Sequence, residues 1–261
     1  MNKKTITLFS VFIAVMCIAA RTVTLIYATE SATGFFISKL STLGILISVA
    51  IFVFALIASF FAFTVSSSEL KSLEISKTNG IISILLGVSI ILYCFGFGIH
   101  DTVFLWQRIL ETVSGFAAGL WFVIFGVNAF YSIKMPEYLS AIPCIHWIFR
   151  LIVVFGTFSS NALVAEHIFS LAALSSTCVF MLLFGKRYVK IESEKSDKLF
   201  YPTAICAAIL NLTSSLSRII VTVIGASDRI HAEANIDLVS LFAGVFMLVM
   251  VTDIKSKEKE S

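Results

Sequence analysis

Long apolar runs alternate with short polar segments along the whole chain. A helix that crosses a bilayer needs about 20 mainly apolar residues, because it rises about 1.5 Å per residue and the hydrocarbon layer is roughly 30 Å thick. Eight stretches meet this requirement, at about residues 5–27, 37–63, 80–99, 111–132, 141–159, 166–185, 202–224 and 237–253. The pattern predicts an all-α fold, a polytopic membrane helical bundle of about eight transmembrane helices.

The connections between these stretches are too short to form a soluble catalytic or nucleotide-binding domain. We therefore predict that residues 1–261 form a single integral membrane domain. Composition agrees, because 58% of the residues are hydrophobic and only 13% are charged, whereas soluble domains carry about 25% charged residues. With 19 basic against 16 acidic residues, the chain lacks the bulk positive charge of a nucleic-acid binder. The lipid bilayer is the expected partner, and no nucleic acid is expected.

Basic residues separate sharply between the two predicted sides of the membrane. The opposite-side loops hold only Lys39, Arg108 and Arg229. Since loops rich in lysine and arginine stay in the cytoplasm, we predict a multi-pass protein of the cell (cytoplasmic) membrane with both termini cytoplasmic. The thirteen bases assigned to the cytoplasmic side are Lys3, Lys4, Lys71, Lys77, Lys134, Lys186, Arg187, Lys190, Lys195, Lys198, Lys255, Lys257 and Lys259.

A short motif recurs in the second helix of each predicted helical hairpin: a serine, two further residues, then a small residue. An arginine precedes three of these serines by 20 or 22 residues. Each hairpin starts on the cytoplasmic side, so we predict four parallel hairpin repeats, at residues 1–65, 78–134, 139–186 and 200–255. Small residues one turn apart favour close helix packing, which is the expected role of the motif. Its four copies start at Ser41, Ser114, Ser170 and Ser240.

Three arginines, Arg21, Arg150 and Arg218, lie inside the predicted spans. Each costs at least about 2.5 kcal/mol to insert and cannot lose its charge, because the guanidinium pKa exceeds about 12. They therefore demand partners. The predicted outer ends of the hairpins supply seven acids, namely Glu30, Asp101, Glu111, Glu166, Asp228, Glu233 and Asp237.

Two interpretations of these arginines stay open. In the first, they are neutralised structurally by acids, with Glu30, Glu166, Asp228 and Asp237 as candidate charge partners. In the second, they line an outward-facing, water-filled pocket between the first, fifth and seventh spans, where guanidinium groups bind an anion. Helical spacing adds polar neighbours on the same faces. The candidate ligand-binding residues are Arg21, Arg150, Arg218, Asn211, Ser215 and His146.

No other chemistry is strongly indicated. The sequence lacks the HExxH, GxSxG and GxxxxGK[ST] motifs, so no nucleophile elbow, metalloprotease helix or phosphate-binding loop is expected. The five cysteines lie in apolar spans. We predict no enzyme activity, no cofactor and no metal site. The expected function is that of a small-solute or anion transporter or binding subunit with a small anionic solute as ligand. The alternative is a membrane sensor, accessory or scaffold subunit that docks another membrane protein.

Overall fold

The computed structural model describes residues 3–30, 36–64, 76–97, 105–131, 135–158, 165–191, 194–226 and 237–253. Within these ranges the chain forms eight α-helices and no extended strand, which confirms the predicted all-α bundle. The helices are α1 (Lys3–Tyr27), α2 (Ser41–Ala62), α3 (Lys77–Leu92), α4 (Leu105–Tyr131), α5 (Ala141–Phe158), α6 (Ala165–Tyr188), α7 (Glu194–Val223) and α8 (Leu238–Asp253). Three short turns join them: the 3₁₀ turns η1 (Ser38–Leu40) and η4 (Glu137–Ser140), and the π-helical turn η3 (Tyr93–Phe97).

Among the described residues, seven helices are long and apolar enough to cross a membrane, as expected of a multi-pass membrane protein. The eighth, α8, is apolar but has only 16 residues, which makes it about 24 Å long at about 1.5 Å per residue. Helices α4 and α7 begin before their apolar runs, at Leu105 and Glu194. A helix continues into polar sequence because its hydrogen bonds do not depend on apolar side chains. The membrane in which the protein lies and the side of that membrane that holds the termini stay predictions.

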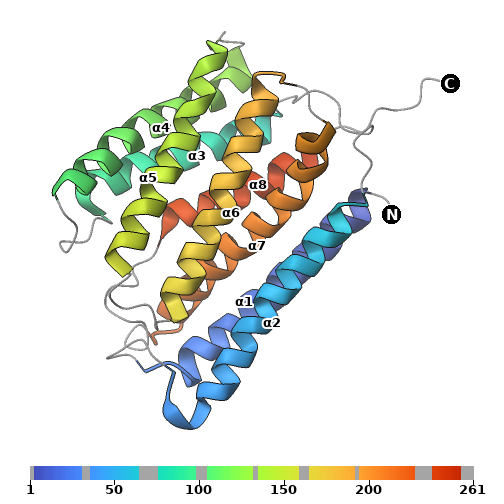
Figure 1. The fold of residues 1–261 in the computed structure, drawn as a ribbon, viewed down its shortest axis with the longest axis vertical. Helices are drawn as coiled ribbons and strands as arrows, with labels where there is room; N and C mark the ends of the chain where they lie inside the picture. Colours follow the sequence, from blue (N-terminus) through green and yellow to red (C-terminus); the bar gives the residue numbers. More distant parts are fainter. Residues whose placement is uncertain are drawn as a thin grey trace.

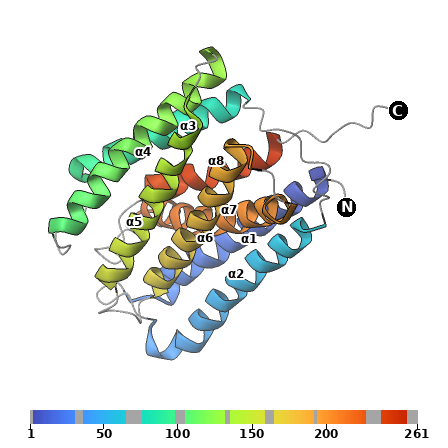
Figure 2. The ribbon, with the colours of Figure 1, turned by 45° about the horizontal axis from the view of Figure 1, so that its top comes forward.

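Helix α7 lies at the centre of the bundle (Figures 1 and 2), where it packs against α1, α2, α6 and α8. Helices α1 and α2 form one side, and α3, α4 and α5 form the other, with α6 between α5 and α7. The two helices of every predicted hairpin pack against each other. That the four hairpins are copies of one unit remains a prediction.

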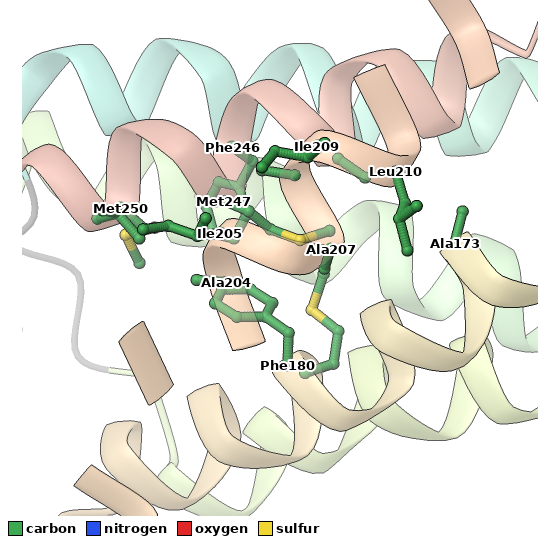
Figure 3. Packing of buried hydrophobic residues seen from close by; sticks show 14 of the residues in the cluster. Ala173, Phe180, Ala204, Ile205, Ala207, Ile209, Leu210, Phe246, Met247 and Met250 are labelled. Atoms are coloured by element: carbon green, nitrogen blue, oxygen red, sulfur yellow. The ribbon is translucent and has the colours of Figure 1, made fainter. Parts of the chain in front are cut away.

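The core forms where alanine and aliphatic side chains of α7 meet large side chains of its neighbours. Figure 3 shows Phe246 and Met247 of α8 beside Ile205 of α7, with Phe180 of α6 near Ala204. Alanine lets the helix axes approach, and the larger side chains fill the remaining space. By contrast, the outer side of α2 exposes large apolar side chains. Such a surface suits acyl chains rather than water.

Glycines bring α3 and α4 into backbone contact. A Cβ atom added to Gly87 would lie 2.5 Å from the carbonyl oxygen of Gly119, and one added to Gly126 would collide with the carbonyl oxygen of Gly80. The predicted packing role of small residues is thus seen at Gly119. Gly115, four residues earlier in α4, instead makes room for side chains in the polar cluster described next.

Candidate functional site: a buried polar cluster around Arg150

A cluster of polar side chains from α4 and α5 lies beside the end of α3 and the start of α8. Helix α4 contributes Glu111 and Ser114, which are three residues apart and so share one face. Helix α5 contributes His146 and Arg150, four residues apart. The cluster is completed by Tyr93 from η3 and by Asp237, which directly precedes α8. We call these six residues the Arg150 cluster.

The Arg150 guanidinium is only 4% exposed, and it pairs with Asp237 through an Nη2 to Oδ2 distance of 2.7 Å. Asp237 also caps α8, accepting hydrogen bonds from the Ser240 backbone nitrogen at 3.1 Å and from the Ser240 hydroxyl at 2.6 Å. Burial by itself raises the pKa of Asp237, but the Arg150 charge and the Ser240 donors together hold this pKa below its usual value. The predicted pairing of a spanning arginine with Asp237 is therefore present.

Aromatic rings cover the Arg150 guanidinium on other sides. Its central carbon lies 4.7 Å from the centre of the Tyr93 ring and 5.3 Å from that of Trp147. Rings at this distance attract a guanidinium through their negative faces, with more effect when water is excluded. Arg150 is thus held by one carboxylate and two rings.

His146 is fully buried beside α4. Its Nδ1 lies 3.3 Å from the Ser114 hydroxyl. The approach depends on Gly115, because a Cβ atom there would lie 3.2 Å from Cε1 of His146 and would collide with Sγ of Cys94. Gly115 therefore serves the polar cluster, where the sequence suggested only helix packing.

Three members of the cluster, Glu111, Ser114 and Tyr93, are not among the site residues predicted from the sequence, and Glu111 is the charged one. Its side chain is 2% exposed. It interacts with the Tyr93 hydroxyl and with the charges of Arg150 and Asp237. One feature of the sequence indicates that Glu111 belongs to the cluster, since Glu111 and Ser114 have helical spacing. What the sequence lacked was the extension of α4 back to Leu105, which places Glu111 well within a helix and not at its end.

Several buried polar atoms of this region have no hydrogen-bond partner within the described residues. They belong to Arg150, Glu111, His146 and the neighbouring Trp147. Native proteins leave few buried groups unsatisfied, and a group of them in one place calls for water or a ligand. The atoms are Nε and Nη1 of Arg150, Oε1 of Glu111, Nε2 of His146 and Nε1 of Trp147.

The other two spanning arginines meet at one turn of α6. The Arg21 guanidinium lies 4.4 Å from the centre of the Phe169 ring, and Arg218 donates from Nη2 to the hydroxyl of Ser170 over 3.4 Å. Both arginines are buried. Of their predicted partners, Glu30 is exposed after α1. The Glu166 backbone lies in α6 near this turn, but its side chain and all of Asp228 lie outside the described residues.

The predicted pocket between the first, fifth and seventh spans stays a prediction. Within the described ranges α5 packs along α4 and α6, and it does not pack along α1 or α7. Arg150 contacts residues of η3, α5 and the start of α8, whereas Arg21 and Arg218 contact α6. Helical spacing shows which residues share a face but not which helix that face meets.

Asn211 and Ser215 lie on the polar face of α7, and the side chain of Asn211 links α7 to α6. Asn211 is fully buried and donates from Nδ2 to the Thr177 hydroxyl of α6 over 2.8 Å. It also donates to the Ala207 carbonyl, and the Ser215 hydroxyl donates to the Asn211 carbonyl over 2.7 Å. A role in ligand binding remains a prediction for both residues.

Replacing Asn211 by leucine is expected to lower the free energy of unfolding by about 1 kcal/mol, since the hydrogen bond across the helices is lost. Adding Thr177→Val should restore most of this, because neither partner is then left unsatisfied. Thermal unfolding in detergent measures both effects. A double variant that is less stable than Asn211→Leu would contradict the assignment.

Three of the four motif serines contact charged or polar residues of these sites. Ser114 contacts His146, Ser170 contacts Arg218, and Ser240 contacts Asp237. The fourth, Ser41, donates to the Ser38 carbonyl. The motif therefore does more than permit packing.

No group of histidine, cysteine and acidic side chains suited to a metal ion occurs among the residues that the structure describes. Three histidines stand next to or near an acid in the sequence. Two of these pairs, at residues 100–101 and 231–233, lie outside the described residues, as do the side chains at 166–167. Comparison of the chain with protein-family models, curated proteins and solved structures gave no match.

Proposed function

We propose that this multi-pass membrane protein is a small-solute or anion transporter, or the binding subunit of one, and that the Arg150 cluster is its binding site. A guanidinium in a site that excludes water binds carboxylate and phosphate groups strongly and with defined geometry. Arg150 is such a group, with 4% exposure. The ligand class that fits it is a small anionic solute.

One observation carries this proposal: buried donors and acceptors without partners are gathered in one place. Nε and Nη1 of Arg150 are donors, while the Glu111 carboxyl group, whose Oε1 has no partner within the described residues, can accept in either charge state. A purely structural charge network should satisfy its own members, since each unsatisfied buried group costs about 1–3 kcal/mol. Unused hydrogen-bonding capacity of both kinds fits a polar solute better than it fits a permanent brace.

Asp237 then acts as an internal substitute for the ligand. Its carboxylate holds one edge of the Arg150 guanidinium in the manner of a bound anion. A solute carboxylate would displace it, and the helix α8 that Asp237 caps would respond. Binding at Arg150 is thereby linked to the position of a helix, which is what a carrier needs to change the side on which its site opens.

A second candidate function has its own support. All three spanning arginines are less than 10% exposed, and Arg150 already has a carboxylate partner. This arrangement also suits a sensor, accessory or scaffold subunit whose arginines are neutralised structurally and which acts by docking another membrane protein.

A ligand screen on the purified protein separates the two candidates. If a small anion binds at Arg150, the free energy of unfolding measured in the presence of carboxylates or phosphate will rise with the logarithm of the anion concentration, by about 2.7 kcal/mol at 100 times the Kd. The charge-balanced double variant Arg150→Gln/Asp237→Asn should abolish the rise. Arg108→Gln is the control, because Arg108 is an exposed arginine of α4.

Two results would count against the transporter proposal. One is an undiminished anion response in the double variant. The other is the absence of stabilisation by any anion while the wild type remains folded, which favours the accessory subunit.

A further inference from the structure

We propose that Glu111 is a proton-binding site, and that a proton bound there accompanies the solute at the Arg150 cluster. The coupling to a solute rests on the proposed function. The bound proton itself does not, because it follows from how the cluster balances its charges. A proton is the smallest ligand that satisfies a buried carboxyl group.

Glu111 is buried as deeply as the core residues, with 2% of its surface exposed. No basic side chain forms an ion pair with it among the described residues, since Arg150 pairs with Asp237. Its Oε1 atom also lacks a hydrogen-bond partner within that part of the chain. An ionised carboxylate without a paired cation is very costly away from water.

Titratable and charged side chains face Glu111 from each element packed around it. Tyr93 and Cys94 approach from η3, His146 and Arg150 from α5, and Asp237 from the start of α8. One permanent cation therefore serves two carboxyl groups. Arg150 is engaged by Asp237 at 2.7 Å, which leaves Glu111 as the carboxyl group that needs another positive charge. A proton on Glu111 makes the cluster neutral.

The local backbone places a hydroxyl beside this carboxyl group. Tyr93 opens the π-helical turn η3, and Gly96 within that turn has a φ of 103°. π-Helical turns redirect side chains and often occur at functional sites. Here the turn holds the Tyr93 hydroxyl next to Glu111 and its ring over Arg150. A hydroxyl both donates and accepts, so it suits a relay that delivers a proton to the carboxyl group.

Loss of this proton would weaken the ion pair between Arg150 and Asp237. The step is simple: the carboxylic acid of Glu111 becomes a carboxylate, and one proton leaves. The new negative charge competes with Asp237 for Arg150 and repels an anionic solute. Proton and anion therefore bind together, and a proton gradient can supply the energy that an ATPase domain would otherwise provide.

Infrared spectroscopy of the protein in lipid bilayers tests the bound proton directly and needs no solute. A protonated carboxyl group has a C=O stretching band that shifts in D₂O. We expect the wild type to show this band at neutral pH and Glu111→Gln to lose it. Glutamine resembles the neutral acid in shape, so the variant should fold. Glu137→Gln, an exposed position in η4, is the matched control and should keep the band.

Each outcome bears on the proposal. Absence of the band in the wild type, or its persistence in Glu111→Gln, overturns it. If Glu111→Gln fails to fold, Tyr93→Phe decides, because removal of the hydroxyl that contacts the Glu111 carboxyl group should shift the band to higher frequency. An unchanged band in Tyr93→Phe assigns it to another carboxyl group and overturns the proposal. A band at Glu111 together with a failed anion screen keeps the proton site and removes the transporter. A successful screen without the band does the reverse.

Discussion

Asp237→Asn is expected to lower the free energy of unfolding by about 3–5 kcal/mol, because it leaves the charge of a buried arginine without its partner. Arg150 cannot release its proton to escape this cost. Asparagine caps a helix about as well as aspartate does, so the start of α8 keeps its hydrogen bond from Ser240. The loss will therefore report the ion pair and not the helix cap.

Thermal or denaturant unfolding in detergent measures this effect. The double variant Arg150→Gln/Asp237→Asn should recover much of the loss, since it removes both charges and keeps polar side chains at both places. Glu137→Gln, at an exposed position, should change stability by less than about 0.5 kcal/mol. If the double variant were as unstable as the sum of its single variants, the pair would contribute nothing.

The same pair gives the wild type a defined acid sensitivity. The pKa of Asp237 is lowered in the folded protein, where the Arg150 charge outweighs the effect of burial. A group with a lowered folded pKa stabilises above its unfolded pKa, which is about 3.9 for aspartate, and this contribution is lost as the pH falls through the folded value. Asp237→Asn should therefore remove part of the loss of stability below about pH 4.

Gly87→Val is expected to cost about 3 kcal/mol or more, because overpacking a tight helix contact forces the backbones apart. A Cβ atom on Gly87 would lie 2.5 Å from the Gly119 carbonyl oxygen and 2.9 Å from the backbone nitrogen of Val123. Neither is the movable end of a side chain, so helices α3 and α4 must separate. Since η3 follows α3, the shift will also displace Tyr93 from Arg150.

Unfolding in detergent again gives the magnitude, and the infrared band of Glu111 reports whether the cluster has been disturbed. Gly156→Ala is the matched control within a helix, because its new Cβ would meet only the flexible amide of Gln107, at 3.0 Å. That variant should remain within about 1 kcal/mol of the wild type. A stable Gly87→Val protein with an unchanged band would contradict the close contact of α3 and α4.

The individual helices were largely predictable from the sequence, and the reason is local. Apolar runs of spanning length, such as residues 37–63, have only one low-energy form in lipid, since every backbone group must bond within its own helix. Structure adds length at polar ends, where α7 starts at Glu194 before its apolar run. Helix α8 is short because it begins only after Asp237, which caps it, and this too depends on the sequence nearby.

The candidate site was predictable in part. An arginine inside a span is recognisable from the sequence, because its charge is costly in lipid and needs a partner. Asp237 was among the acids predicted to be that partner. Glu111 and Tyr93 carried no comparable sign, since residues near helix ends are ordinarily polar or aromatic. Their importance arises from burial and from the π-helical turn, neither of which follows from residue type.

By itself, the sequence determined that the chain is a bundle of membrane-spanning helices with three arginines that need partners, because solvation in lipid acts on each segment separately. Only the tertiary structure decided which partners these are. It separated Arg150, which joins Asp237, from Arg21 and Arg218, which meet at α6. That choice depends on which helices lie side by side, and packing between distant segments is set by the shapes of many side chains together.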